Sequence, residues 1–359
     1  MEGSVDLTAL PAAGPISELV RGLLASPSET AASLPPAASA AVEGLLGDVR
    51  DPLADDDLQL ALYLCFELHY RSFPGVAEEW EWSPGLIAIR AVLERAFLSA
   101  LEKDLRPTSP FVEHSETKGE VGRGGIDPEG VGDALFRLEA EDDGVSLSRH
   151  LEVASGIEEF REFVIHRSLY QLKEADPHSW AIPRLSGAAK TALLEVQGDE
   201  YGGGRAERMH SALFAKTMRA LGLDDGENAY LSHVPGVTLA TVNLMSAFGL
   251  RRSRRGAIVG HLAMFEMTSP GPNRRYGNAL RRLGFDGEAT DFYDEHVEAD
   301  AVHENIAAYD LAGGLARAEP QLTEDILFGA RALLHLEDRF ARHLLAAWEH
   351  GGSSLRRPL

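Results

Sequence analysis

The chain has a single cysteine, few basic residues and no long apolar run, and each scarcity excludes a class of protein. Cys65 is alone among 359 residues, so no intrachain disulfide can form, which fits a reducing cytosol. The 34 Lys and Arg against 56 Asp and Glu give a net charge of -22, which disfavours nucleic-acid and anionic-membrane partners. The sequence has neither a run of membrane-spanning length nor a basic-then-apolar signal pattern. We therefore expect a cytoplasmic protein.

Alternating apolar and polar strand segments are also missing, and helical periodicity takes their place. This pattern predicts an all-α fold, a bundle of about seven core helices with extra N-terminal helices. The segments with helical spacing are 16–24, 55–72, 85–104, 156–175, 186–201, 205 onward, 237–250, 256–267, 273–283, 291–309 and 322–349.

Composition divides the chain into three parts. Residues 1–110 form a helical region, 111–150 a loop or linker rich in Gly, Glu and Pro, and 151–359 the main domain. The N-terminal helices could mediate a homodimer or could cap the bundle. Glu67 and His69 of this region could be metal ligands, although an ion-pair cluster is the favoured interpretation.

The segment 291–309 carries the strongest chemical signal. His296, Asp300 and His303 are four and three residues apart, so at about 100° per residue all three leave one face of a helix. Because ionisable groups are costly to bury without compensation, this stripe favours a metal ion. Mixed imidazole and carboxylate ligands suit iron, manganese or zinc. A hydrogen-bonded core network or a surface cluster remains the alternative.

Four further groups occupy apolar faces of other predicted helices. Together with the stripe on 291–309 they supply enough carboxylates and imidazoles for a two-metal site in a bundle. These residues are Glu174, Glu200, Glu266 and His210. Taken singly, an inward glutamate could instead belong to a buried ion pair with Arg167 or Arg184. Three consecutive glycines, 202–204, predict a bend between Glu200 and His210.

The order and spacing of these residues resemble the heme-oxygenase-like di-iron oxidases and oxygenases, often described as iron-containing redox enzymes. The resemblance covers about residues 155–350 and rests on four stretches, which are 172–178, 199–210, 265–267 and 296–303. It implies the ligand set Glu174, Glu200, His210, Glu266, His296, Asp300 and His303. Some relatives place the second carboxylate three residues before the histidine, at Glu207. We favour Glu200, because Glu207 follows the glycine break among charged neighbours.

The resemblance also implies two ferrous ions per chain, O2 as co-substrate, a small-molecule substrate and room for an external electron donor. N-oxygenation of an amine or amino acid in bacterial natural-product biosynthesis is the first expectation for the reaction. The alternative is C–C cleavage or desaturation of an aliphatic acid or amino acid. A non-catalytic helical scaffold and a metal-storage protein are further hypotheses.

Overall fold

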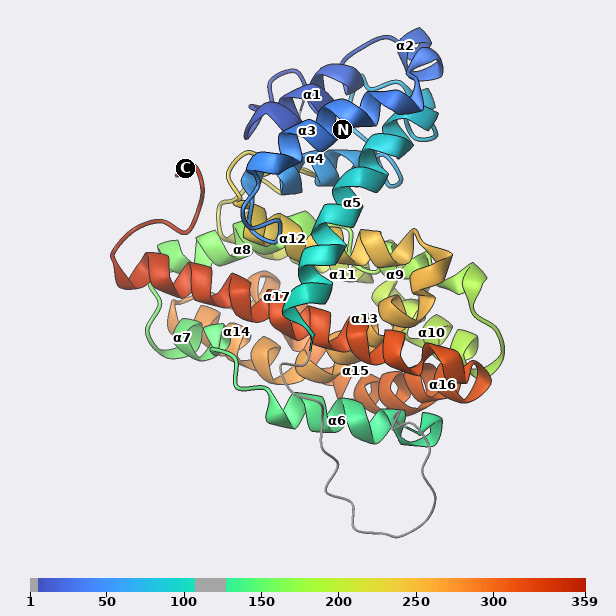
Figure 1. The fold of residues 1–359 in the computed structure, drawn as a ribbon. Helices are drawn as coiled ribbons and strands as arrows, with labels where there is room; N and C mark the ends of the chain where they lie inside the picture. Colours follow the sequence, from blue (N-terminus) through green and yellow to red (C-terminus); the bar gives the residue numbers. More distant parts are fainter. Residues whose placement is uncertain (1–5, 107–126) are drawn as a thin grey trace.

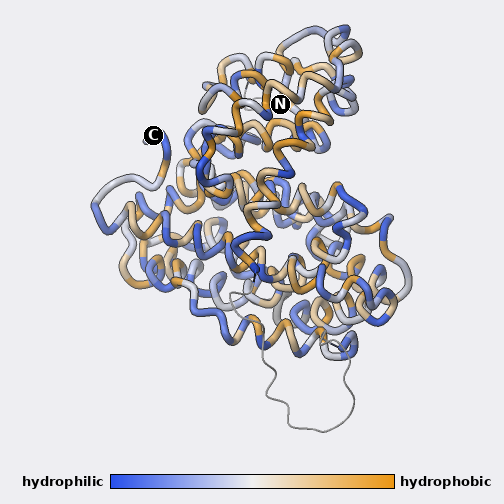
Figure 2. The backbone as a smooth tube through the Cα atoms, viewed as in Figure 1, coloured by the Kyte–Doolittle hydropathy of each residue, from blue (hydrophilic) through white to orange (hydrophobic). Residues whose placement is uncertain are grey.

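The computed structural model describes residues 6–106 and 127–359, apart from the side chains of 298–302. All regular elements in these parts are helices, so the predicted all-α class is confirmed. Figure 1 shows a smaller cluster of N-terminal helices beside a larger bundle that contains the remaining helices. Along the tube of Figure 2, orange and blue segments alternate within single helices, as expected for helices with one buried face.

The N-terminal cluster contains five α-helices, which are α1 (Pro15–Leu24), α2 (Ser28–Ser33), α3 (Ser39–Leu45), α4 (Asp56–Glu67) and α5 (Pro84–Asp104). Asp55 caps α4, because its carboxylate accepts hydrogen bonds from the amides of Asp57 and Leu58. Asp57 in turn accepts bonds from the amides of Ile16 and Ser17, which fixes α1 to the start of α4. Figure 1 shows α5 extending from this cluster across the bundle.

The bundle is built around seven helices, which are α8 (Ile157–Gln171), α10 (Gly187–Glu200), α11 (His210–Ala220), α12 (Gly236–Gly249), α13 (Arg255–Thr268), α15 (Asp291–Asn305) and α17 (Thr323–Glu349). Three further helices connect them, namely α9 (Asp176–Ser179), α14 (Pro270–Arg282) and α16 (Gly313–Ala318). A π-helix, η10 (Ile306–Ala312), continues α15. None of the helices in the described ranges combines the length and the apolar composition needed to cross a membrane.

Helices α13 and α17 cross at very short distance because each presents a glycine to the backbone of the other. A Cβ atom on Gly260 would lie 1.8 Å from the carbonyl oxygen of Ile326, and one on Gly329 would lie 2.0 Å from that of Ala257. Side chains at these two positions would therefore push the helices apart. The close crossing fixes α13, the helix that carries Glu266.

The N-terminal cluster and the bundle meet at a buried ion pair. Lys173, just after α8, pairs with Glu67 of α4, and the Lys173 ammonium lies 4.7 Å from the ring centre of Tyr63. His69 hydrogen-bonds Glu81 and contacts Arg90. Glu67 and His69 thus have the partners expected of a structural ion-pair cluster, and this cluster ties the N-terminal helices to the bundle.

The described part of the predicted linker contains two helices that the sequence analysis missed there. Within the predicted linker 111–150, residues 107–126 lie outside the described residues, but α6 (Val131–Glu141) and the start of α7 (Leu147–Val153) follow. α6 forms because Val131, Ala134 and Leu135 are buried against the bundle.

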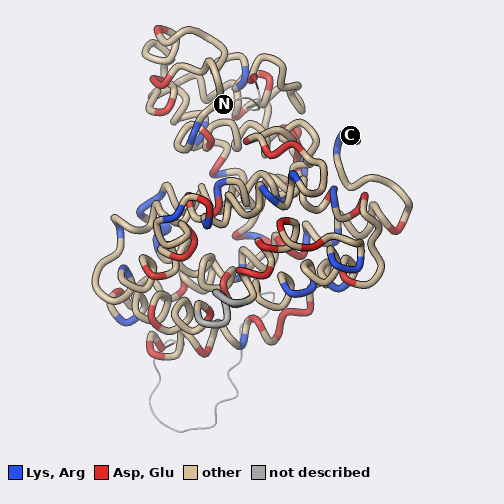
Figure 3. Tube along the Cα trace, turned by 180° about the vertical axis from the view of Figure 1, so that it is seen from behind, with Lys and Arg blue, Asp and Glu red and all other residues tan. Residues whose placement is uncertain are grey.

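Basic and acidic segments are interspersed along the trace in Figure 3, and neither sign gathers on one side in that view.

Candidate metal centre

The predicted ligands converge on one place in the bundle. Among the residues with described side chains, six of the seven predicted ligands are buried, namely Glu174, Glu200, His210, Glu266, His296 and His303. They come from the turn after α8, the end of α10, the start of α11, and the helices α13 and α15. The seventh, Asp300, lies in α15, but its side chain is outside the described residues.

The first half of the cluster combines two glutamates and two histidines. Ligand atoms of Glu174, His210 and His296 all lie within 4.8 Å of one another. His296 Nε2 is 3.7 Å from Glu174 Oε1, and His210 Nδ1 is 3.1 Å from Glu200 Oε2. The imidazole rings of His210 and His296 have centroids 4.3 Å apart. These four groups from four segments therefore face a common point.

The second half of the cluster lies about two helical turns further along α15, at His303. His303 Nδ1 is 3.4 Å from Glu266 Oε2. Burial raises the pKa of Glu266, with the neighbouring His303 opposing the shift and the charge of Glu200 adding to it. Burial likewise raises the pKa of Glu174, and the charge of Glu200 again adds to the shift. Glu200 thus acts electrostatically on both halves, which form one continuous cluster.

Two backbone turns bring these groups together. The predicted helix 156–175 ends earlier, at Gln171, and Ala175 adopts a positive φ of 73°, so Glu174 enters the centre from a turn and not from a helix. Gly202 also has a positive φ, 66°, and a Cβ there would lie 2.6 Å from the backbone of Arg208. The glycine turn therefore returns the chain sharply and sets His210 beside Glu200.

The glycine turn also bears on the choice between Glu200 and Glu207. The expected bend at 202–204 is present, but the helix resumes at His210 and not at Arg205, because two short 3-10 turns fill the gap. Glu207 lies in the second of these turns and is exposed. Glu200 is buried against His210. The geometry therefore supports Glu200 as the carboxylate that shares the site with His210.

The predicted alternative, ion pairing of the inward glutamates with arginine, is not what the structure shows. Arg167 donates two hydrogen bonds to Glu337, with distances of 2.9 and 2.6 Å. Arg184 donates to the backbone carbonyls of Gly249 and Leu250 at the end of α12. Neither arginine pairs with Glu174, Glu200 or Glu266 among the described contacts, so the charge of these glutamates needs another source of compensation.

A metal ion fits this requirement. Both carboxylate oxygens of Glu174 are buried and accept no hydrogen bond from the described residues. A buried carboxylate in that condition is expensive unless it is protonated or bound to a cation. Glutamate and histidine together form a donor set that suits first-row transition metals such as iron. Glu174, Glu200, His210 and His296 could hold one ion, and Glu266 with His303 could contribute to a second.

Hydrogen bonds fix how two of the histidines present their nitrogens. His296 Nδ1 lies 2.7 Å from the carbonyl oxygen of Phe292, so Nδ1–H donates and Nε2 points its lone pair toward Glu174. His303 Nε2 lies 2.9 Å from Asp199 Oδ2, which leaves Nδ1 as the acceptor nitrogen facing Glu266. A carboxylate that orients a ligating histidine is a common feature of metal sites. The sequence analysis missed Asp199, which lies on an exposed helix face.

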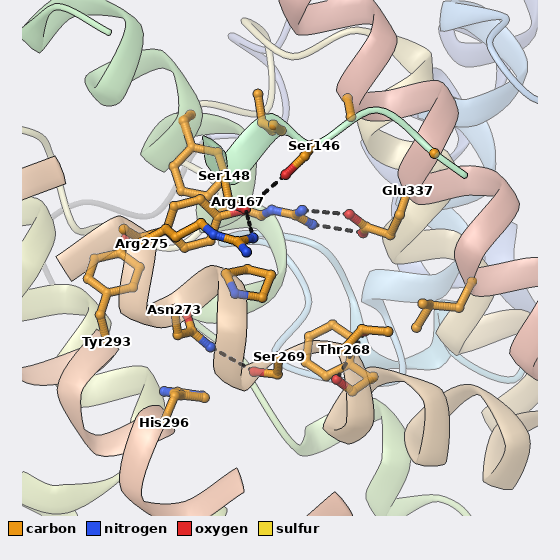
Figure 4. Close-up of a pocket in the computed structure, with 18 of the residues that line it drawn as sticks. Ser146, Ser148, Arg167, Thr268, Ser269, Asn273, Arg275, Tyr293, His296 and Glu337 are labelled. Carbon is orange, nitrogen blue, oxygen red and sulfur yellow. Dashed lines mark hydrogen bonds and ion pairs between the residues drawn. The ribbon is translucent and has the colours of Figure 1, made fainter. Parts of the chain in front are cut away.

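A cavity of about 330 Å³ opens beside the first half of the cluster. Glu174 and His296 line its inner end, and its walls include Phe163, Tyr276 and Leu333. Figure 4 shows Tyr293, Arg275, Ser148 and the Arg167–Glu337 pair around the same space. Its size is at the lower end of the roughly 300–1,000 Å³ found for small-molecule pockets. A small organic molecule could therefore reach the groups of the centre.

Comparison with known proteins agrees with this arrangement. Residues 161–338 match a family described as iron-containing redox enzyme, and this range contains every predicted ligand. A nitrosourea synthase from Streptomyces achromogenes subsp. streptozoticus is 28% identical over 136 residues, which are 38% of this chain and 29% of that protein. The alignment thus spans less than a third of the relative's own length. Through residues 161–338, and with its all-α heme-oxygenase-like bundle, the chain belongs to the family of iron-containing redox enzymes.

Proposed function

We propose that the protein is an O2-dependent di-iron oxygenase that oxidises a nitrogen atom of an amine or amino acid. The observation that carries the proposal is the buried Glu and His cluster, which opens through Glu174 and His296 onto a cavity of about 330 Å³. A storage site or a structural ion-pair cluster needs no such cavity. The relative named nitrosourea synthase supports the choice of nitrogen, because a nitroso group contains a nitrogen–oxygen bond.

Iron bound in this centre would supply the chemistry that activates O2. In an N-oxygenation one oxygen atom joins the substrate nitrogen and the other leaves as water, with two electrons from an external donor. The chain's own groups set the conditions for this reaction. Phe292 and Asp199 orient His296 and His303, while Phe163, Tyr276 and Tyr293 wall the cavity and exclude water.

A second reaction shares the same centre. Phe163, Tyr276, Leu333 and Leu334 give the cavity apolar walls that also suit an aliphatic chain. Oxidative C–C cleavage or desaturation of an aliphatic acid or amino acid is therefore the alternative. The two reactions leave different products, because only N-oxygenation retains an oxygen atom on nitrogen.

The test supplies the ferrous-loaded chain, a chemical reductant and 18O2 with a panel of amino acids and the amines that lack their carboxyl groups. Mass spectrometry of the products should show one labelled oxygen on nitrogen, and His296→Ala should abolish it. Carbon loss or loss of two hydrogens without retained label would instead establish the alternative. Equal O2 consumption by wild type and His296→Ala would overturn both.

A further inference from the structure

The cavity beside the metal centre contains one arginine whose charge is compensated and one whose charge is not. Arg167 and Arg275 both line it. Arg167 forms a two-point ion pair with Glu337, at 2.9 and 2.6 Å, and its guanidinium carbon lies 4.5 Å from the ring centre of Phe340. The charge of Arg167 is therefore compensated, and the orientation of its guanidinium fixed, by groups of the protein itself.

Arg275 has no comparable ion pair among the described residues. Its Nη1 donates one hydrogen bond, of 3.0 Å, to the hydroxyl of the buried Ser148. Within the described parts of the chain, no carboxylate lies within ion-pair distance of Arg275. A guanidinium has five N–H donors in a planar fork that matches a carboxylate in two-point geometry. Held by one neutral partner at a cavity wall, Arg275 is therefore disposed to bind an anion from solution.

An aromatic wall joins Arg275 to the metal centre. The next residue, Tyr276, packs against Tyr293 with ring centroids 5.7 Å apart, and Tyr293 precedes His296 by almost one helical turn on α15. Figure 4 shows Tyr293 between Arg275 and His296. The cavity thus has a cationic end, an apolar middle and an end at the metal centre.

We propose that Arg275 binds the carboxylate of the substrate, and that the site takes monocarboxylic molecules whose reacting part extends past Tyr276 and Tyr293 to the metal centre. Ser148 positions the guanidinium. Glu139 and Asp142 line the same cavity and form no ion pair with the described residues, so a second negative charge on the substrate is disfavoured. This inference rests on the proposed function, which makes the cavity a substrate site. It narrows the substrate class from amines in general to carboxylic acids such as amino acids.

The test measures binding to the 359-residue chain after removal of metal, so that no probe can coordinate iron. The probes are three acid–amide pairs, 4-fluorobenzoate, 4-fluorophenylacetate, 3-(4-fluorophenyl)propionate and their amides, observed by 19F NMR titration. We expect at least one acid to bind wild type about tenfold or more tightly than its amide, because the ion pair with Arg275 is charge-assisted. Arg275→Ala should lose that preference, and Arg275→Lys should retain part of it.

The neighbouring Arg274, which is exposed, gives a matched control for charge. Arg274→Ala should bind the acids as wild type does, and circular dichroism of all variants checks the fold. Equal affinity of acids and amides for wild type, including no binding of either, would overturn the inference. So would equal weakening by the Arg274 and Arg275 variants. The test needs neither iron nor O2, so it can fail while the di-iron proposal stands, and the reverse also holds.

Discussion

At the scale of single residues, the centre places acceptor atoms face to face. His303 Nδ1 and Glu266 Oε2, both buried, are 3.4 Å apart, while Asp199 holds the proton of the imidazole on the other nitrogen. His210 Nδ1 and Glu200 Oε2 are 3.1 Å apart. Two such acceptors attract each other only when a proton or a metal ion lies between them. The local geometry therefore points to a bound proton or metal ion, which packing alone does not require.

The choice between the two candidate carboxylates can be tested directly. Glu200→Gln should weaken ferrous binding at least about tenfold, because it removes a charged donor from the buried cluster. Glu207→Gln removes the same charge from an exposed turn and should change the affinity little. Anaerobic ferrous titration of both variants measures this difference. The opposite order would assign the ligand to Glu207.

A second buried histidine pair makes stability depend on pH. His178 Nε2 lies 3.1 Å from His261 Nδ1, and burial lowers the pKa of His261 to about 3 and that of His178 well below its usual value. Below about pH 6.5 the unfolded chain therefore binds more protons than the folded chain, and stability falls as the pH falls.

His261→Gln should reduce this loss. Between pH 7 and pH 5 the metal-free variant should lose about 1–2 kcal/mol less of its free energy of unfolding than wild type. Urea unfolding at the two pH values gives the quantity. His350 is exposed, so His350→Gln is the control and should follow wild type. Parallel pH dependence of wild type and His261→Gln would show that this pair does not titrate on unfolding.

Much of the centre follows from periodicity, and the remainder depends on tertiary placement. Glu266, His296 and His303 lie on helix faces that also carry apolar residues, so sequence spacing predicts that they point inward. Asp199 and Arg275 lie on exposed or half-buried faces. Their roles depend on which helix lies opposite them, and spacing within one helix carries no information about that.

At the scale of elements, turns position the centre as much as helices do. Glu174 enters from a turn with a positive φ at Ala175, and Glu200 meets His210 across the glycine turn. Sequence analysis predicted the glycine break at 202–204. It wrongly extended the helix predicted for 156–175 through Glu174. It also assigned the segment of α6 to a linker, because a short amphipathic helix among polar residues gives a weak periodic signal.

The α13–α17 crossing is the element contact most sensitive to substitution. Gly329→Ala would place a Cβ atom 2.0 Å from the carbonyl oxygen of Ala257, so one helix must shift. We expect a loss of about 1–3 kcal/mol in the free energy of unfolding, typical of overpacking. Gly22→Ala on α1 is the control, because nothing lies within 4 Å of that position. Alanine there should leave stability unchanged or raise it by up to about 1 kcal/mol. Similar values for both variants would refute the close crossing.

At the scale of the whole molecule, the N-terminal helices are joined to the centre through Glu67 and Lys173. Lys173 directly precedes Glu174, so the ion pair holds the turn that carries a candidate ligand. The extent of residues 1–110 as a unit remains a prediction from composition. Its contact with the bundle gives it a role in supporting the site, whatever its part in oligomerisation.

Glu67→Gln tests this connection. It leaves the buried Lys173 ammonium without its ion-pair partner, so the free energy of unfolding should fall by about 3 kcal/mol. Weaker ferrous binding should accompany the loss, because the turn at Glu174 loosens. Glu18, whose pair with Arg21 is exposed, provides the control, and Glu18→Gln should change stability by less than about 0.5 kcal/mol. Urea unfolding that fails to separate the two variants would argue against a structural role for the buried pair.

The central claim is a di-iron centre built by the clustered glutamates and histidines. Anaerobic titration of the metal-free chain with ferrous iron, followed by rapid mixing with O2, tests it most directly. The account predicts two irons per chain and a transient visible absorption after mixing, both lost in His303→Ala. One tightly bound iron or none, with no response to O2, would contradict the di-iron centre and leave a mononuclear or structural role for these residues.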